Sequence, residues 1–387
     1  MLVQSIVRLL YIAPIDFLND MFSSAWISRA RSLSERGWEV AFVTPSSRSG
    51  ENAPDISEFR IFEIDRSSIP GLGGFSWERS LRKRLGLIID EFSPEVIISD
   101  WNGSGGVSAI AKDYAIPWVF DDHSPPANDD LLGKLQWIHY DRNWRKFSVE
   151  ADGVVVLTNS LEKFIRDRFG HSFEMVKCQS GVDLELFSHY PEKSSSPIKL
   201  VYHGSITRER GVLELIDVVE KLSEEGFDFR LRIFGDGPAL PDFKKAAQSS
   251  EKYEILGRVR FNEVPELLSD CHIGLLPWPS SPAFSTSSPI KLFEYAASGL
   301  AVVGTNVESN VPFDGNEWFR IADKMNISES LFGAIKKLII EDRLGRLGNL
   351  SRLDAEERFS WKNVTEDLHL LLIKLIGSKD EQSRSSN

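Results

Sequence analysis

Short runs of apolar residues recur along this chain, and most of them are apolar throughout instead of alternating with polar residues. Continuous runs of this kind are typical of parallel β-strands that helices cover on both faces. The pattern therefore predicts strands at the following ranges: Leu9–Ala13, Glu39–Thr44, Val96–Ser99, Trp118–Phe120, Gly153–Leu157, Lys199–Tyr202, Arg230–Phe234, Ile273–Leu276 and Ala301–Gly304.

Segments with a helical period lie between these runs. An apolar stripe over 26–33 follows the first run and ends at Gly37, and a second stripe over 212–222 ends at Gly226. Glycine is a common residue just beyond a helix C-terminus. Strands that alternate with helices indicate βαβ units and a doubly wound parallel sheet.

The chain is long enough for two domains, because its 387 residues exceed what one hydrophobic core usually organises. The segments SLSERGWEVAFVTP and KLSEEGFDFRLRIFG resemble each other, which indicates two copies of one architecture. The polar, Pro- and Ser-rich stretch Tyr190–Pro197 is the predicted linker. We therefore expect an α/β protein with Rossmann-like, doubly wound domains over 1–190 and 191–357, facing each other across a cleft.

The C-terminal segment has a further helical pattern. The predicted helix covers 358–376, and its apolar stripe includes Val364, Leu368 and Leu372. A stripe of this kind must pack against something, and a return to the first domain is one option. The polar segment 377–387 that follows is expected to be disordered.

The charge balance and the cysteine content exclude some functions. Lys and Arg number 45 and Asp and Glu number 57, giving a net charge of −12, which argues against nucleic acid as a partner. Cys178 and Cys271 lie far apart and form neither a disulfide framework nor a metal-ligand pattern. These features indicate a reducing, cytoplasmic setting. The N-terminal stretch 1–17 lacks the basic start of a signal peptide and is expected to contain the first strand.

Ligands of open parallel sheets bind beyond the carboxyl ends of the strands. The most informative segment there is FSTSSPIKLFEYAASGLAVVGTN, in which Ser288 is expected to cap a helix whose N-terminus suits a phosphate. Lys291 lies in the first turn, and Glu294 lies one turn further, where its carboxylate can accept two sugar hydroxyls. The alternative is a well-capped buried helix with a Lys–Glu contact.

Two more segments end at the same edge. In LVYHGSITRERGVLELI, Gly204 allows close backbone approach, and the guanidinium groups of Arg208 and Arg210 can hold a diphosphate. The alternative for this segment is a solvated charged loop. In RIFGDGPAL, Gly235 opens a tight turn that ordinary loops also contain. Since all three segments end neighbouring strands, they point to one anion site.

These stretches also carry a family resemblance. VVVLTNSLEKFI, SGVDLELF, VYHGSITRERGV, RIFGDGP, CHIGLLPW and SPIKLFEYAASGLAVVGT occur in the order and spacing of the retaining glycosyltransferases called group 1 or family 4, and the chain resembles that family over nearly its whole length. The resemblance implies the two-domain GT-B architecture. It also implies transfer of a sugar, with retention, from a nucleotide-diphosphate donor to a hydroxyl acceptor such as a glycan or a lipid-linked saccharide. No cofactor is implied beyond the donor itself.

The resemblance assigns roles to the donor segment. Arg210 matches a position that contacts the donor diphosphate, and Glu294 matches the residue that binds the donor ribose. The backbone of Ser288, Pro289 and Ile290 lies where amides meet the phosphates. The remaining donor-site candidates are Gly204, Ser205, Arg208, Gly235 and Lys291.

Two positions depart from the family pattern. Many members carry a glutamate that contacts the transferred sugar eight residues before the ribose-binding one, and here Thr286 stands at that position. Members often have an Arg directly after the glycine that matches Gly204, and here that residue is Ser205, for which Arg208 could substitute. These departures leave open a non-catalytic scaffold that binds sugar nucleotides. A sugar-nucleotide epimerase or a phosphorylase of the same architecture is another alternative.

The N-terminal half is expected to hold the acceptor. In WVFDDHSPP, His123 lies where the family often has a histidine that faces the transferred sugar, and His123 is therefore the second catalytic candidate beside Glu294. The alternative is that these polar residues only cap a loop. The further acceptor-side candidates end other strands or follow them: Asp16, Asp100, Trp101 and Asp122.

Two helical segments raise the question of a membrane. Trp77–Phe92 is basic and amphipathic, so it suits either the inner face of an anionic membrane or an ordinary solvated outer helix. Lys134–Lys146 mixes aromatic and basic residues, and it could stack a sugar or a lipid-linked acceptor or only cover the core. No divalent metal is expected, because arginines and a helix N-terminus already serve the phosphates.

Overall fold

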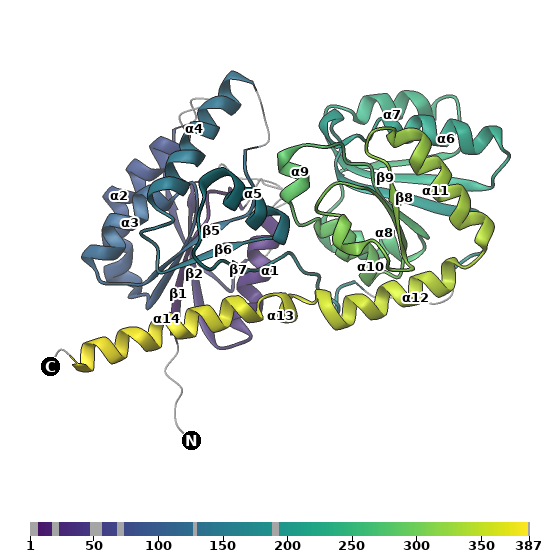
Figure 1. Ribbon diagram of the computed structural model, residues 1–387. Coiled ribbons are helices and arrows are strands. Elements are labelled where there is room, and N and C mark those ends of the chain that lie inside the picture. Colours follow the sequence, from purple (N-terminus) through teal and green to yellow (C-terminus); the bar gives the residue numbers. More distant parts are fainter. Residues whose placement is uncertain are drawn as a thin grey trace. The chain divides into compact units, whose positions relative to one another are not determined.

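The computed structural model describes residues 7–17, 23–46, 56–67, 73–126, 130–187 and 193–385. The chain divides into two compact units, one formed by 1–179 with 364–387 and the other by 180–363. Each unit contains one parallel sheet with helices on both faces (Figure 1). The prediction of two doubly wound α/β domains is therefore confirmed.

The first unit has a seven-stranded sheet in the order β3-β2-β1-β4-β5-β6-β7 among the described residues. Its strands are β1 Val7–Ile12, β2 Trp38–Pro45, β3 Arg60–Ile64, β4 Val96–Asp100, β5 Trp118–Asp122, β6 Gly153–Val156 and β7 Val176–Lys177. The chain order reverses between β1 and β4, which is the point where open α/β sheets bind ligands.

Helices of the first unit cover two separate cores. They are α1 Ser23–Ser34, α2 Gly73–Phe92, α3 Ser104–Asp113, α4 Leu131–Lys146, α5 Asn159–Phe169 and α14 Glu366–Ser385. Along β1, Leu10 points to the core under α2, and Leu9 and Tyr11 point to the core under α1 and α14. Alternate residues of one strand face opposite sides of the sheet, which explains the continuous apolar runs.

The second unit has a six-stranded sheet in the order β10-β9-β8-β11-β12-β13 within the described part of the chain. Its strands are β8 Ile198–Ser205, β9 Phe229–Asp236, β10 Tyr253–Gly257, β11 Ile273–Leu276, β12 Ala301–Thr305 and β13 Phe319–Ala322. Its helices are α6 Glu214–Glu224, α7 Leu240–Ala247, α8 Val264–Ser269, α9 Pro282–Thr286, α10 Ile290–Ala297, α11 Ile327–Glu341 and α12 Leu344–Asp354, and the short α13 Trp361–Val364 leads back to the first unit.

The boundary between the units lies earlier than the expected 190/191. The division falls after Gln179 because the following segment is bound to the second unit. Val182 N donates to Phe359 O at 2.8 Å, and Phe187 is buried in the second core. Residues 188–192 of the expected linker lie outside the described residues.

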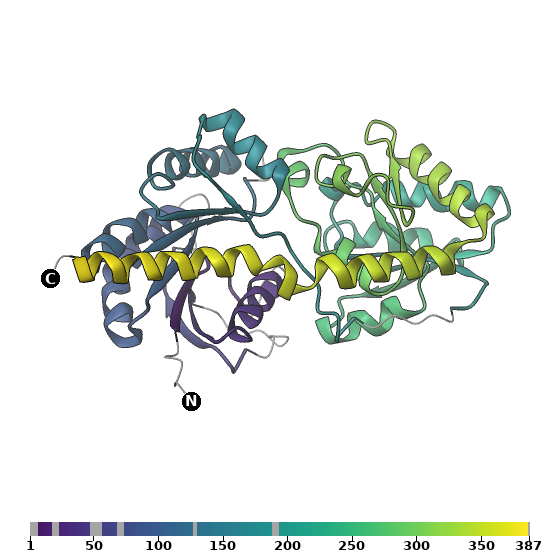
Figure 2. The same cartoon turned by 60° about the horizontal axis from the view of Figure 1, so that its bottom comes forward.

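The C-terminal helix α14 belongs to the first unit, as Figure 2 shows. Leu368 and Leu372 are buried in its core, and Trp38 Nε1 donates to His369 Nδ1 at 2.9 Å. The helix continues to Ser385, so the expectation of disorder over 377–385 is wrong. Beyond the apolar stripe, Ser378 Oγ donates to Lys374 O one turn earlier in the helix, at 2.8 Å.

The apolar stripe of the amphipathic helix α2 packs inside the first unit. Trp77, Leu81 and Leu85 are buried in the core of the first unit. Most of the apolar face that was considered for a membrane is therefore occupied by the core, and the exposed side of this helix carries four basic residues together with Leu87, Asp90 and Glu91.

Candidate functional site

The predicted donor residues meet at the carboxyl ends of β8 and β9. Gly204 on β8 lies opposite Gly235 on β9 in the register of the sheet. Gly235 has φ of +133°, and a Cβ on it would lie 1.8 Å from Gly204 O. Gly204 has φ of +101°, and a Cβ on it would lie 3.2 Å from Lys291 Nζ. Side chains larger than glycine would fill the space into which the Lys291 amine extends.

Lys291 and Arg210 bring two cationic groups together in this place. Lys291, in the first turn of α10, is half-buried, and desolvation of its amine together with the neighbouring Arg210 lowers the pKa of the amine to about 7. Arg210 lies in the turn Arg208–Arg210, with its guanidinium 5.4 Å from the centre of the Phe284 ring. Two like charges at a partly desolvated site repel each other, and a bound anion would relieve that repulsion.

Glu294 lies one helical turn after Lys291 and is buried. Its Oε2 lies 3.1 Å from Nε2 of His203, on β8. The His203 ring stacks on Phe234, with ring centres 5.1 Å apart. Sequence reasoning missed His203, although a histidine directly before the strand-end glycine was a visible signal. The structure thus brings Gly204, Lys291 and Glu294 together and adds His203.

Ser288 does not cap α10, so that part of the prediction is wrong. The helix starts at Ile290, and Pro289 occupies the position before its first turn. Ser288 Oγ instead accepts a hydrogen bond from Ser180 N at 2.9 Å, and Ser180 Oγ donates to Ser288 O at 3.3 Å. Ser288 therefore holds the start of the donor helix against the segment that enters the second unit.

Arg208 and Thr286 make local contacts that differ from those of Arg210. Arg208 Nη2 donates to Asp242 Oδ2 at 2.9 Å, in an ion pair whose arginine side chain is 63% exposed. Thr286 is buried and donates to Pro282 O at 2.8 Å inside α9. Ser205, half-buried, accepts the Tyr202 hydroxyl at its carbonyl at 2.8 Å. Arg208 thus takes part in an exposed ion pair in this structure.

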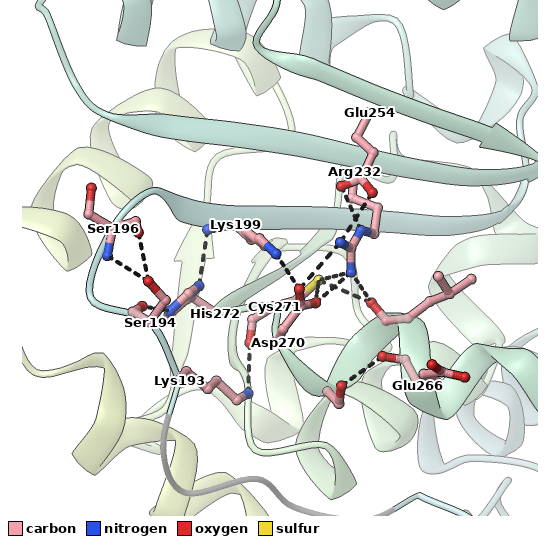
Figure 3. Close-up of polar contacts among 12 residues, drawn as sticks. Lys193, Ser194, Ser196, Lys199, Arg232, Glu254, Glu266, Asp270, Cys271 and His272 are labelled. Carbon is pink, nitrogen blue, oxygen red and sulfur yellow. Dashed lines mark hydrogen bonds and ion pairs between the residues drawn. The ribbon is translucent and has the colours of Figure 1, made fainter.

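The opposite end of α10 is held by another lysine, Lys193, whose contact with Cys271 is drawn in Figure 3. Lys193 Nζ donates to Ser298 O at 3.0 Å, to Gly299 O at 2.9 Å and to Cys271 O at 2.7 Å. Burial lowers the pKa of this amine to about 8. Carbonyls at a helix C-terminus carry partial negative charge, so the ammonium of Lys193 stabilises the helix that carries Lys291.

Next to Lys193, Arg232 connects three elements (Figure 3). Its guanidinium donates to Glu254 Oε2 at 2.8 Å and to Asp270 Oδ1 at 2.5 Å. These contacts lie near the amino ends of β8 and β11, away from the donor residues at the carboxyl ends. The neighbouring Cys271 is buried, and burial raises the pKa of its thiol to about 12, which disfavours the reactive thiolate.

In the first unit, His123 follows β5 and is tied to its strand. His123 Nε2 lies 2.9 Å from Asp121 Oδ2 and 3.2 Å from Arg29 Nη1. The imidazole stacks on Trp26 with ring centres 3.9 Å apart and an interplanar angle of 9°. Burial lowers the pKa of His123, with Arg29 acting in the same direction and Asp121 opposing it. The ring is thus held on two sides by the fold.

The Asp122 side chain lies on the face of the sheet opposite to that of Asp121. Its Oδ2 accepts the Tyr140 hydroxyl at 2.7 Å and Trp144 Nε1 at 2.8 Å, and Oδ1 accepts Ser124 N at 3.0 Å. Burial raises the pKa of this carboxyl to about 7. The structure places Asp122 against the inner side of α4, and its bond to Ser124 N closes a turn that contains His123.

The other acceptor-side candidates lie at the ends of strands or after them. Asp100 is buried, and its Oδ1 accepts the backbone N–H of Asn102 at 2.8 Å. Trp101 is buried in the core with its ring edge toward Tyr140. Asp16 is half-buried in the segment after β1.

Within the described ranges, no group of three or more His, Cys, Asp or Glu side chains is arranged to hold a metal ion. In the same ranges, no helix is both long enough and apolar enough to span a membrane.

Two family profiles match the chain. The profile described as glycosyltransferase family 4 matches residues 27–186, and the profile described as glycosyl transferases group 1 matches residues 197–341. The first match therefore covers most of the first unit and the second match most of the second unit.

Among curated relatives, WcaL of Escherichia coli, assigned as a colanic acid biosynthesis glycosyltransferase, is 27% identical over 201 residues, or 50% of this chain and 49% of WcaL. TuaC of Bacillus subtilis, assigned as a teichuronic acid biosynthesis glycosyltransferase, is 24% identical over 282 residues, or 69% of this chain and 62% of TuaC. The chain thus spans about half the length of the first relative and 62% of the second.

Solved structures share the fold. Sucrose-phosphate synthase from Thermosynechococcus elongatus superposes with a TM-score of 0.76 at 13% identity, covering 96% of this chain and 100% of that one. A glycosyltransferase from Rickettsia africae superposes with a TM-score of 0.73 at 17% identity, covering 97% and 98%. At these identities the similarity shows the GT-B fold.

Proposed function

The chain belongs to the glycosyltransferases of group 1 and family 4, and from this premise we propose that it transfers a sugar from a nucleotide-diphosphate donor to a hydroxyl acceptor, with retention of configuration. The observation that carries the proposal is the pair of cations formed by Lys291 and Arg210 beside Gly204. A diphosphate has the charge to neutralise both groups and the size to fit beside a glycine.

The proposed contacts to the ribose and to the phosphates also come from α10 and the residues before it. Glu294 lies about 4.5 Å further along the axis of α10 than Lys291, at 1.5 Å per residue. A buried carboxylate at that distance can accept ribose hydroxyls while the ammonium contacts phosphate, and charge-assisted bonds of this kind are the stronger ones. We propose that Glu294 binds the ribose and that the backbone of Ser288, Pro289 and Ile290 contributes to the phosphate site.

For the reaction, the protein must stabilise charge on the leaving nucleoside diphosphate. Lys291 and Arg210 supply fixed positive charge where that negative charge develops, which is the kind of stabilisation that contributes most in such sites. No metal ion is required for this proposal. His123 is the residue that we propose to contact the transferred sugar.

The donor proposal is tested by titration calorimetry of the protein with nucleoside diphosphates, without added metal. We expect one nucleoside diphosphate to bind, and Lys291→Met to weaken its binding by about tenfold or more, since it removes a charge-assisted bond. The matched control is Lys337→Met, because the Lys337 side chain is 71% exposed on α11. Equal affinities in the two variants would contradict the donor site.

Catalysis is tested separately from binding. Incubation with a panel of sugar nucleotides, followed by product analysis, separates three cases: transfer or hydrolysis supports a transferase, a changed sugar configuration in the free nucleotide sugar indicates an epimerase, and binding with no turnover indicates a scaffold. Because WcaL and TuaC are assigned to polysaccharide biosynthesis, we propose a glycan or a lipid-linked saccharide as the acceptor.

We further propose that the first unit contacts the inner face of a membrane through α4. The outer side of α4 exposes four aliphatic residues, Leu131, Leu132, Leu135 and Ile138. The exposed charged residues of the same helix are Lys134, Arg145 and Lys146. Exposed apolar side chains beside cations suit a surface of anionic lipids.

The membrane proposal is tested by co-sedimentation with phosphatidylglycerol-containing vesicles and with vesicles of phosphatidylcholine alone. We expect binding to the anionic vesicles only, and its loss in the triple variant Leu131→Ser, Leu135→Ser, Ile138→Ser. Ile340→Ser is the control, because Ile340 is similarly exposed on α11. Unchanged sedimentation of the triple variant would contradict a role for α4.

A further inference from the structure

We propose that Asp121, held by Arg29 and Tyr11, is a positioning residue that keeps His123 as the neutral tautomer with its proton on Nε2. In this tautomer Nδ1 is a hydrogen-bond acceptor, so that a hydroxyl of the transferred sugar would donate to it. The inference rests on the proposed function for the role of the sugar, whereas the tautomer follows from the structure of the first unit alone.

The tautomer follows from a count of protons. Arg29 Nη1 has two hydrogens, and it donates to Tyr11 Oη at 3.0 Å and to Asp121 Oδ2 at 2.9 Å. The Tyr11 hydroxyl has one hydrogen, which it donates to the same Asp121 Oδ2 at 2.7 Å. With these protons assigned, the 2.9 Å contact between His123 Nε2 and Asp121 Oδ2 requires a hydrogen on Nε2.

The opposite assignment would be unfavourable. If Nε2 had no hydrogen, its lone pair would face an oxygen of a buried carboxylate at 2.9 Å. Both hydrogens of Arg29 Nη1 are already donated to Tyr11 and Asp121. The 3.2 Å approach of Nη1 to His123 Nε2 is therefore a close contact and not a hydrogen bond. Arg29 is fixed further by its Nη2, which donates to Cys178 O at 2.8 Å.

The charge balance keeps the imidazole neutral. Arg29 and Asp121 are 1% and 0% exposed, and their opposite charges compensate each other. A proton added to His123 would place an uncompensated positive charge beside Arg29 in a buried site, which is costly. The other ionisable neighbours, Tyr11 and Cys178, have pKa values raised by burial and stay neutral near pH 7.

The orientation of the ring directs Nδ1 away from this network. Stacking on Trp26 fixes the plane of the imidazole, and the contact with Asp121 fixes its rotation in that plane. Among the described residues, the hydrogen-bond contacts of the His123 ring all involve Nε2. The side chain is 16% exposed, so its free edge can meet a ligand.

Two substitutions of His123 test the inference in the intact protein. The amide of asparagine can replace Nδ1, and the longer amide of glutamine can replace Nε2. We expect His123→Asn to keep more turnover than His123→Gln, by roughly tenfold, because only asparagine leaves an acceptor for the sugar hydroxyl. A greater turnover of His123→Gln, or equal turnover of the two, would overturn the inference.

Nitrogen-15 NMR of the His123 ring provides a readout without activity. We expect the wild type to show a protonated Nε2 and an unprotonated Nδ1 from pH 6 to 8, and Asp121→Asn to show a mixture of tautomers. Tyr11→Phe removes one donor to Asp121 but leaves the Asp121 contact with His123, and should keep the wild-type tautomer. A proton on Nδ1 in the wild type at pH 7 would overturn the inference.

The two failures are distinguishable. If the wild-type protein binds no nucleotide sugar and transfers no sugar, the proposed function fails, whatever the NMR spectra show. If it transfers sugar but Asp121→Asn leaves the tautomer unchanged in a folded protein, the positioning role of Asp121 fails by itself. Far-ultraviolet circular dichroism of each variant establishes that it is folded, which matters because Asp121→Asn leaves Arg29 without its buried partner.

Discussion

Nε2 of His203 at the end of β8 lies 3.1 Å from Oε2 of Glu294 on α10. One carboxylate oxygen of Glu294 therefore already lies beside a ring nitrogen of His203. A buried carboxylate with one oxygen beside this ring can accept hydroxyl groups of a ligand with its other oxygen. This contact gives the proposed ribose site a second residue, from the neighbouring β-strand.

The first prediction concerns Glu294. Glu294→Ala should weaken binding of the preferred nucleoside diphosphate by about tenfold or more, because it leaves ribose hydroxyls unpaired at a cost of about 1–3 kcal/mol. Glu294→Gln retains one good acceptor and should weaken binding only modestly. Titration calorimetry measures both. If Glu294→Ala lowers the thermal stability but leaves the affinity per folded molecule unchanged, Glu294 is a structural residue of α10.

The second prediction concerns pH. The pKa of Lys291 is lowered to about 7, so the amine of the free protein is charged below that pH and increasingly neutral above it. A bound diphosphate favours the charged form. Above pH 7 binding must therefore take up a proton, and the affinity should fall by up to about tenfold per pH unit.

Titrations from pH 6 to pH 9 in wild type and Lys291→Met check this dependence. The variant is also the control, because the ligand's own ionisation affects both proteins equally. The difference between the two affinities should be largest near pH 6 and should shrink above pH 7. A constant difference over the whole range would mean that Lys291 does not titrate in the free protein.

The periodicity of the sequence was sufficient to predict the central strands and α10. Strands with apolar residues on both faces, such as β4 and β12, were predicted because their burial produces continuous apolar runs. The strands β3, β7, β10 and β13 were missed. All lie at or next to sheet edges and contain charged or half-buried residues, so their pattern resembles that of a loop.

Contacts between distant segments could not be predicted in this way. The two aspartates of β5 illustrate this point. Consecutive residues of a strand face opposite sides, so Asp121 and Asp122 had to point apart. Which of them joins His123 depends on which helix covers each face. Asp121 faces Arg29 on α1, whereas Asp122 faces Tyr140 on α4. The local sequence around β5 does not indicate either pairing.

The third prediction separates backbone strain from the shape of the site. Gly204 and Gly226 have φ of +101° and +78°, so alanine is strained at both positions. A Cβ at Gly226 meets nothing within 4 Å, whereas a Cβ at Gly204 would lie 3.2 Å from Lys291 Nζ. Both alanine variants should therefore lose about 1 kcal/mol or more of stability, and only Gly204→Ala should also lose nucleotide affinity.

Thermal unfolding and titration calorimetry of these two variants form a matched pair. The stability loss common to both measures the strain of the left-handed backbone, and the loss of affinity specific to Gly204→Ala measures the displacement of the Lys291 amine. Equal affinity losses in Gly204→Ala and Gly226→Ala would show that the effect comes from general destabilisation.

The last prediction concerns Lys193, which is far in sequence from the helix it holds. Its ammonium donates to the carbonyls of Ser298, Gly299 and Cys271, at the end of α10 opposite to Lys291. Lys193→Met keeps the aliphatic stem but leaves these buried carbonyls without their donor, which should cost about 1–3 kcal/mol of stability. Thermal unfolding measures this loss, with the exposed Lys337→Met as control.

Lys193→Met should also affect the ligand site indirectly. If Lys193 only stabilises the second unit, the variant should unfold at a lower temperature yet bind nucleoside diphosphate with unchanged affinity while folded. If the amine also sets the position of α10, the affinity should fall together with the stability, and a fixed concentration of nucleotide should raise the unfolding temperature of the variant by less than that of the wild type. The contacts of Lys193 with the carbonyls of Ser298 and Gly299, the two residues that follow α10, favour the second outcome, because movement of that end would move Lys291 and Glu294 with it. An unfolding temperature equal to that of Lys337→Met would contradict both roles.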